Sequence, residues 1–161
     1  MTENTLYSEP NIYDIFFSED LTANDVKFYT ELIKDFGQPV LELACGTGRI
    51  AIPIAEKGIK ITGIDLSEEM IKTGKQKDTQ SLVDFRVGDM RNIELNEKYK
   101  FIFIPKNSFQ HLLTNEDVIN CFQSVCEILD NNGAFLIQIF VPYFPILMRN
   151  ANDRYPTSKE F

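Results

Sequence analysis

The chain has 161 residues, of which 43% are hydrophobic and 12% aromatic, and its 24 acidic and 16 basic side chains give a net charge of −8. A chain of this length hides about two-thirds of its surface on folding, which is enough for one hydrophobic core and predicts a single domain over residues 1–161. The negative charge excludes a generic binder of nucleic acid or anionic membranes, because phosphate contacts need clustered lysine and arginine.

No apolar run reaches the roughly 18 residues that span a bilayer, and the N-terminus lacks the basic-then-apolar pattern of a secretory signal. We therefore expect a cytoplasmic protein. The cysteines are three, an odd number, and show no C-x-x-C spacing, so neither a disulfide framework nor a metal site is indicated. Cys121 and Cys126 lie in an apolar helical pattern, where we expect both to be buried.

Short apolar runs alternate with helical patterns over residues 21–141, the expected core, between an aromatic segment at 1–20 and a polar tail at 142–161. Capping residues and apolar spacing predict helices at 22–36, beginning at a Thr22 cap, at 48–57, from a Ser67 cap to residue 77, and from a Thr114 cap to Gly133. Apolar runs predict strands at 39–44, 59–64, 82–87, 99–104 and 134–141.

Strands that alternate with helices pair in parallel through right-handed crossovers. The first, fourth and fifth strands are almost continuously apolar, which is typical of a sheet covered by helices on both faces. The sequence therefore predicts an α/β fold, a three-layer sandwich around a mainly parallel sheet of five strands.

A glycine-rich turn, ELACGTGRIA at residues 42–51, joins the first strand to the next helix. Gly46 and Gly48 permit a tight turn with positive φ and let a ligand approach the bare backbone. The helix that follows presents free N–H groups toward the crevice. Asp65 stands at the tip of the second strand, where nucleotide-binding α/β folds place a carboxylate for ribose hydroxyls.

Two further acids favour a ligand over a plain structural turn. Glu42 interrupts an apolar strand, and a carboxylate is costly to bury unless a cation or a hydrogen-bond donor accompanies it. Asp89 and Met90 end the third strand, and an acceptor beside a soft apolar side chain suits the amino group and the ring face of an adenine.

These segments resemble class I S-adenosylmethionine-dependent methyltransferases of the small-molecule type over about residues 20–141. LELACGTGRI is similar to the family's glycine-rich motif, GIDLS to its ribose motif, VGDMRN to its adenine motif, and PKNSFQHL to the segment after the fourth strand. The resemblance implies a Rossmann-like sheet of order 3-2-1-4-5, S-adenosyl-L-methionine as the cofactor, and a small-molecule methyl acceptor with an amine or hydroxyl group.

The resemblance also implies where each part of the cofactor would bind. At the methionine end, Gly46 and Gly48 would flank the chain, with Ala44 in the same turn, while Glu42 and the backbone around Pro105 would contact the ammonium group. At the adenosine end, Asp65 would bind the ribose diol and Asp89 would accept from the adenine amino group. Leu66 and Met90 would contact the two faces of the adenine ring.

Two residues have more than one reading. His111, the only histidine, follows the fourth strand and is our candidate for the catalytic base. In the alternative, it only holds the following helix in place. Asn107 and Gln110 are candidate polar contacts beside it. Arg49 would pair either with the cofactor carboxylate or with a surface acid, and its place in the first helical turn favours the ligand slightly.

A nicotinamide-dependent dehydrogenase is the rival enzyme, because Gly46-x-Gly48-x-x-Ala51 also fits the dinucleotide fingerprint. Its cofactor carries a pyrophosphate, which Glu42 would repel, whereas a sulfonium cofactor with an ammonium group would be attracted. Charge therefore favours the methyltransferase. A third hypothesis is a module that binds S-adenosylmethionine without turnover.

The ends of the chain carry the remaining expectations. An aromatic segment would either close over the cofactor or pack on the sheet; it contains Tyr7, Tyr13, Phe16 and Phe17. The family's sheet ends in an antiparallel hairpin for which this chain offers no pattern, so we expect a shortened form in which the fifth strand is an edge. The alternative is a homodimer that covers this edge.

Overall fold

The computed structural model describes residues 10, 14 and 19–141 of the chain, and the side chains from residue 23 onward within the last range. The aromatic residues of the N-terminal segment and the tail from residue 142 lie outside the described residues. The helices are α3 (Glu19–Phe36), α4 (Ala51–Ala55), α5 (Glu68–Lys77), the short 3-10 helix η1 (Ser108–His111) and α6 (Asn115–Ile128). The strands are β1 (Val40–Leu43), β2 (Ile61–Asp65), β3 (Val83–Val87), β4 (Tyr99–Ile104) and β5 (Leu129–Ile137).

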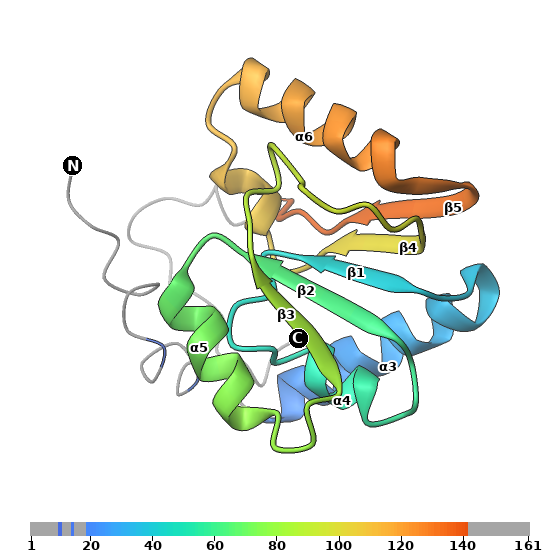
Figure 1. The fold of residues 1–161 in the computed structure, drawn as a ribbon, viewed down its shortest axis with the longest axis vertical. Helices are drawn as coiled ribbons and strands as arrows, with labels where there is room; N and C mark the ends of the chain where they lie inside the picture. Colours follow the sequence, from blue (N-terminus) through green and yellow to red (C-terminus); the bar gives the residue numbers. More distant parts are fainter. Residues whose placement is uncertain (1–9, 11–13, 15–18, 142–161) are drawn as a thin grey trace, which may run out of the picture.

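The five strands form one sheet of order β3-β2-β1-β4-β5, and every pair of neighbours is parallel. This confirms the expected Rossmann-like order. Figure 1 shows the sheet running through the centre of the molecule, with α6 above it and α3, α4 and α5 around its lower side. All strands are parallel, so their carboxyl ends lie at the same end of the sheet. The loops that follow β1, β2, β3 and β4 meet there.

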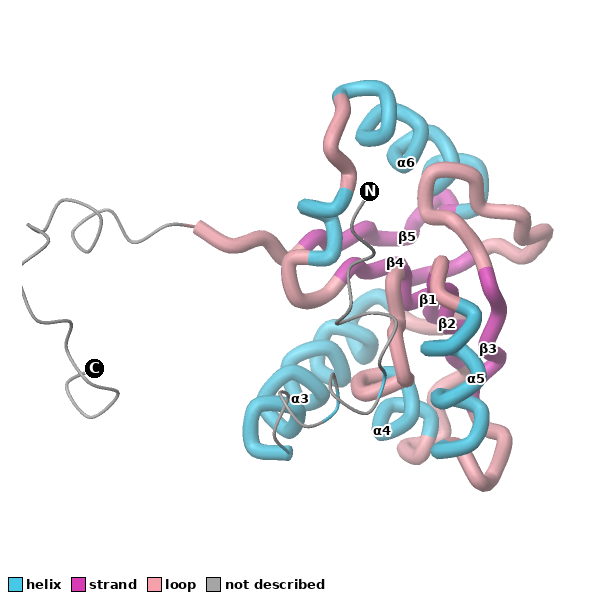
Figure 2. Tube along the Cα trace, turned by 90° about the vertical axis from the view of Figure 1, so that its left-hand side faces the viewer, coloured by secondary structure: helices cyan, strands magenta, loops and turns pink. Residues whose placement is uncertain are grey.

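Helices cover both faces of the sheet, as Figure 2 shows: α6 lies on one side and α3, α4 and α5 on the other. The side chains of β1 alternate between the two layers. Val40 packs with Tyr29 and Ile33 of α3, whereas Leu41 and Leu43 pack toward α6. Glu42 follows the same alternation and therefore points, like Val40, into the layer of α3 and α4.

Two of the expected caps are confirmed. The Ser67 hydroxyl accepts a hydrogen bond from the Met70 backbone N–H at 3.2 Å, and the Thr114 hydroxyl accepts one from the Asp117 N–H at 3.0 Å. Thr22, by contrast, is not a cap, because α3 begins three residues earlier at Glu19. The helix expected from Gly48 is also shorter, since residues 46–50 form a turn and α4 begins only at Ala51.

Gly133 does not end a helix. The last helix ends at Ile128, and Gly133 lies inside β5. A Cβ atom at this position would lie 3.0 Å from the carbonyl oxygens of Tyr99 and Lys100, at a point where the register with β4 is irregular. The glycine therefore marks a close approach of two strands, and the strand expected at 134–141 begins and ends earlier.

The two cysteines of α6 differ in exposure. Cys121 is buried, but Cys126 is exposed, so the expectation that both are buried was wrong for Cys126. The helix turns by about 100° per residue, and a five-residue step moves a side chain to a different face. No helix in the described part of the chain has both the length and the apolar character needed to cross a membrane.

Candidate functional site

The glycine-rich turn after β1 has an unusual backbone. Ala44, Gly46 and Gly48 have φ angles of 56°, 56° and 78°, in the left-handed region where a side chain other than hydrogen is disfavoured. At Gly48 a Cβ atom would lie 2.4 Å from the ring of Phe85. The glycine at this position therefore has a packing reason, the contact between the turn and β3, in addition to any ligand.

Asp65 ties this turn to the end of β2. Its Oδ2 accepts a hydrogen bond from the Gly46 backbone N–H at 2.8 Å, and its Oδ1 accepts one from the Ser67 N–H at 2.9 Å. Burial raises the pKa of Asp65, while these two backbone bonds and a charge on His111 lower it. This effect indicates that His111, an exposed residue of η1, lies near enough to Asp65 for the two charges to interact.

Glu42 is the most unusual group of the site. Its side chain is 2% exposed, and among the described residues its Oε2 atom has no hydrogen-bond partner. The carboxylate accepts a hydrogen bond from the Ala51 backbone N–H at the start of α4. Desolvation raises the pKa of Glu42 well above its usual range, Arg49 opposes this shift, and Asp65 adds to it. A buried carboxylate with a free acceptor is suited to a cationic ligand.

Arg49 contacts an acid of α3. Its Nη1 donates to Asp25 Oδ2 at 3.1 Å, and Lys106 Nζ lies 3.0 Å from the same oxygen. The side chains of Arg49 and Asp25 are only 8% and 16% exposed, so this acid is not on the open surface. Asp25 thus joins α3 to the glycine turn and to the loop after β4.

The loop after β4 is strained at two consecutive residues, Lys106 and Asn107, whose φ angles are 51° and 64°. Gln138, just after β5, holds this loop. Its Oε1 accepts from the Lys106 N–H at 3.0 Å and from the Tyr29 hydroxyl at 3.0 Å, and its carbonyl oxygen accepts from the Asn107 N–H at 3.2 Å. Strain held by surrounding contacts is typical of functional loops, and this loop contains the buried Pro105.

At the end of β3, Asp89 is bound by Arg91. The guanidinium Nη2 donates to Asp89 Oδ2 at 2.6 Å, and Nε lies 3.0 Å from both carboxylate oxygens. These hydrogen bonds lower the pKa of Asp89. The two apolar residues expected on the adenine differ in exposure: Leu66 is 66% exposed, and Met90 is half-buried against the α6 layer.

The structure therefore brings the expected residues, which lie at or just after the carboxyl ends of β1, β2, β3 and β4, to the same end of the sheet. The residues that sequence reasoning missed are polar partners from other elements: Tyr29, Lys106, Arg91 and Gln138. The sequence held a signal for Gln138. This glutamine interrupts the apolar run AFLIQIF in the same way as Glu42 interrupts PVLELA.

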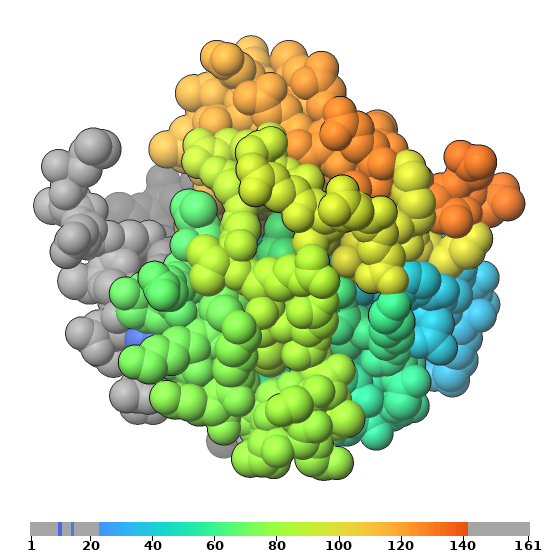
Figure 3. Space-filling model, in the orientation of Figure 1, coloured from blue at the N-terminus to red at the C-terminus, as the bar shows by residue number. Residues whose placement is uncertain are grey.

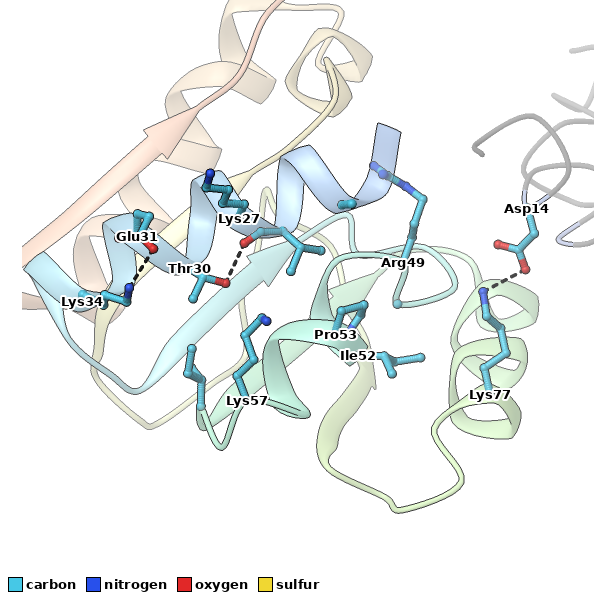
Figure 4. A pocket seen from close by; sticks show the side chains of 14 residues that line it. Asp14, Lys27, Thr30, Glu31, Lys34, Arg49, Ile52, Pro53, Lys57 and Lys77 are labelled. Carbon is cyan, nitrogen blue, oxygen red and sulfur yellow. Dashed lines mark hydrogen bonds and ion pairs between the residues drawn. The ribbon is translucent and has the colours of Figure 1, made fainter. Parts of the chain in front are cut away.

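A separate cavity of about 1070 Å³ lies on the outer side of α3 and α4, and Figure 4 shows the side chains that line it. Its basic residues are Lys27, Lys34, Lys57, Lys77 and Arg49. It contacts the glycine turn at Gly48 and Arg49 but includes none of the acids at the ends of β1, β2 and β3. We therefore assign the candidate ligand site to the crevice and not to this cavity.

Comparisons with known proteins agree with this geometry. A family described as a methyltransferase domain matches residues 40–133. YqeM of Bacillus subtilis (strain 168), provisionally named as a methyltransferase, is 37% identical over 131 residues, which cover 80% of this chain and 53% of that protein. The dTDP-3-amino-3,4,6-trideoxy-alpha-D-glucopyranose N,N-dimethyltransferase of Streptomyces venezuelae is 23% identical over 133 residues. The matched region covers 80% of this chain and 55% of that protein.

Solved structures show the same fold. The glycopeptide N-methyltransferase MtfA complexed with (S)-adenosyl-L-methionine matches with a TM-score of 0.64 and 25% identity, covering 70% of this chain and 52% of that one. The chain thus spans about half the length of the proteins that it matches.

Proposed function

We propose, from the premise that this chain belongs to the methyltransferase-domain family, that it binds S-adenosylmethionine in the crevice and transfers its methyl group to an amine or hydroxyl of a small molecule. The resemblance to class I S-adenosylmethionine-dependent methyltransferases is confirmed for the family and the fold. The activity of the chain and the class of acceptor remain proposals. Two of the similar proteins, which are named as N-methyltransferases, support an amine as the acceptor.

The observation that carries the proposal is the buried carboxylate of Glu42, whose Oε2 atom has no hydrogen-bond partner in the part of the chain that the structure describes. In S-adenosylmethionine, an ammonium group and a sulfonium would bring further positive charge toward this carboxylate. Arg49 supplies one positive charge nearby but is itself bound to Asp25. A ligand ammonium would satisfy the free acceptor and favour the ionised carboxylate, so the residues present fit the group.

At the other end of the crevice, Asp65 would accept the ribose hydroxyls. Its carboxylate offers about four lone-pair sites, and the backbone N–H groups of Gly46, Ser67 and Leu66 engage three of them, so an acceptor site remains for a ribose hydroxyl. The exposed side chain of Leu66 and the half-buried side chain of Met90 offer apolar surface for the adenine ring. Asp89 would accept from the adenine amino group.

The bound cofactor would supply an activated methyl group, so the protein has to align the acceptor and exclude water. A protonated amine or a hydroxyl must also lose a proton, which a nearby base would accept. His111 is our candidate for this base, and its electrostatic effect on Asp65 supports a position beside the crevice. In the alternative, His111 only holds η1 in place.

A binding module without turnover is the second candidate function, because the acids at the strand ends account for cofactor binding, whereas only His111 is assigned to the methyl acceptor. A nicotinamide-dependent dehydrogenase is disfavoured by charge, because the pyrophosphate of its cofactor would be repelled by Glu42.

A cytoplasmic location is also part of the proposal and is supported by the three free cysteines. The net charge of −8 supports the absence of a nucleic-acid or membrane partner.

Calorimetric titration tests these candidates. We expect S-adenosylmethionine to bind and NAD not to bind, and a methyl-release assay with a panel of small amines and alcohols to show turnover for an enzyme. Binding without release from any acceptor would support the module. Binding of NAD but not of S-adenosylmethionine would overturn the proposal.

A further inference from the structure

Arg91, two residues after the proposed adenine acceptor, surrounds one side of the Asp89 carboxylate. Three of its donors reach this group: the backbone N–H at 2.9 Å from Oδ1, Nη2 at 2.6 Å from Oδ2, and Nε, which is shared between the two oxygens at 3.0 Å. Since Asp89 is 29% exposed, its carboxylate would otherwise be free to rotate into solvent. The planar guanidinium fixes its orientation, as a point charge on a lysine would not.

An inventory of acceptors shows what this arrangement leaves open. An ionised carboxylate offers about four lone-pair sites. Four contacts from Arg91 reach the carboxylate, two at each oxygen, but two of them divide the single Nε–H. The shared donor engages each oxygen only in part, so the carboxylate keeps acceptor capacity for one further donor. An adenine amino group has the N–H that such a site accepts, whereas a base with an oxygen at that position would face a fixed negative charge.

Arg91 is itself held by hydrogen bonds to α6. Its Nη1 donates to Asp117 Oδ1 at 2.9 Å, and its carbonyl oxygen accepts from the Ser124 hydroxyl at 3.0 Å. Both partners belong to α6, and Thr114, the cap of α6, donates to the other oxygen of Asp117 at 2.8 Å. Figure 3 shows the connection between β3 and β4, in yellow-green, lying against the orange α6. The guanidinium therefore joins the loop of Asp89 to the first turns of α6.

We propose that Arg91 is a positioning residue that orients the Asp89 carboxylate and so sets the preference of the site for an adenine base over a 6-oxopurine. The inference rests on the proposed function, in which the adenine lies at Asp89. Arg91 acts through Asp89 and contacts no part of the cofactor. Asp117 serves as the brace that holds Arg91 from α6.

The test compares the affinity for S-adenosylhomocysteine with that for its deaminated hypoxanthine analogue, measured by calorimetry. The wild type should prefer the adenine compound. Arg91→Met should bind S-adenosylhomocysteine about tenfold more weakly or worse, the effect of losing one charge-assisted hydrogen bond, and its preference between the two compounds should shrink. Arg91→Lys should recover only part of this preference.

Two further variants separate positioning from general support of the fold. Asp117→Asn keeps the pair of Arg91 and Asp89 and should keep most of the preference. In Asp89→Ala the acceptor is already lost, so adding Arg91→Met should weaken binding little further, as expected for two residues that act through one contact. Thermal unfolding of each variant shows whether it folds.

The outcomes are distinguishable. Equal loss of affinity for both compounds in Arg91→Met, with the preference unchanged, would assign Arg91 a merely structural role and overturn the inference. An Arg91→Met variant with wild-type affinity and preference would overturn it as well. If the wild type bound neither compound, the proposed function itself would fail, because the inference concerns only the preference of a site that binds.

Discussion

Single residues at the strand ends determine the charge of the crevice, and Glu42 is the most deeply buried acid among them. Burial raises its pKa, so the folded protein binds this proton more tightly than the unfolded chain does. The resulting stability is fully present below the unfolded-state pKa and is lost as the pH rises through the raised, folded-state pKa. A ligand cation would offset this loss.

Glu42→Gln tests this balance. Without ligand, the variant should match the wild type in thermal stability near pH 5, where the wild type retains the proton more fully, and gain relative to it toward pH 8.5. Its affinity for S-adenosylmethionine should fall about tenfold or more, since a charge-assisted contact is lost. Thermal unfolding at both pH values and calorimetry measure the two effects. A stability difference independent of pH would contradict the raised pKa.

Asp65 is both a proposed ligand group and a structural one. Asp65→Ala should weaken binding of S-adenosylmethionine about tenfold or more, because the contact to the ribose is lost. The same change removes the bonds from Gly46 and Ser67, so we also expect the free energy of unfolding to fall by about 1–3 kcal/mol. Urea unfolding beside calorimetry separates the two. A variant that unfolds earlier but binds normally would place the ribose elsewhere.

His111→Ala addresses the proton transfer. If the chain methylates an amine, the variant should lose about 100-fold or more in kcat, and the fall in rate at low pH that a protonated base causes should disappear. Gln110→Ala, at an exposed neighbour in η1, is the matched control and should keep the wild-type pH profile. A normal rate with an unshifted profile in His111→Ala would remove this residue from the mechanism.

At the scale of elements, the turn after β1 depends on how α4 and α5 pack on the sheet. Phe85 of β3 occupies the space in front of Gly48, and it also faces Gly74 of α5, where a Cβ atom would lie 3.0 Å from its ring. One aromatic side chain therefore requires glycine at two positions in different elements. This close packing fixes the turn that carries the site.

Gly48→Ala should lower the free energy of unfolding by about 1–3 kcal/mol beyond the cost of its positive φ, because its Cβ atom would overlap Phe85. Gly58→Ala is the matched control: its φ is 80°, close to the 78° of Gly48, but no atom lies within 4 Å of the added Cβ. Urea unfolding of both variants gives the difference. Equal losses would show that Phe85 yields at little cost and that only φ requires the glycine.

At the scale of the whole molecule, β5 is an edge of the sheet among the described strands. The residues just beyond it, Ile139, Phe140 and Val141, are 53%, 61% and 70% exposed. An apolar edge of this kind pairs readily with another chain. This observation supports the proposed homodimer, in which a second copy would cover the edge.

Sedimentation velocity over a range of concentrations tests this proposal. We expect the chain to associate with itself, and Phe140→Lys to shift the equilibrium toward the monomer by placing a charge in the exposed apolar segment just beyond β5. Leu113→Lys, at a residue that is 86% exposed in the loop before α6, is the control and should leave association unchanged. A wild type that stays monomeric at all concentrations would contradict the proposal.

Local patterns predicted most of the fold. The parallel sheet, the caps at Ser67 and Thr114, and the meeting of Glu42, Asp65 and Asp89 at one end of the strands follow from alternation, capping chemistry and the parallel arrangement. The order of the strands came from the resemblance to the family. These signals depend on residues close together in the chain or on rules that hold for all parallel sheets. Gly133 shows their limit, because a glycine that ends a helix and one that lets two strands approach look alike in sequence.

The sequence by itself determined the family, the type of sheet and the acids of the crevice, since each depends on residue types at short, fixed spacings. Only the tertiary structure decided which polar groups meet: that Arg49 pairs with Asp25, that Glu42 keeps a free oxygen, and that Arg91 holds Asp89 against α6. Such pairs join residues far apart in the chain, 26 positions from Arg91 to Asp117 and 109 from Tyr29 to Gln138. Their partners are chosen by how the layers pack, which no local pattern encodes.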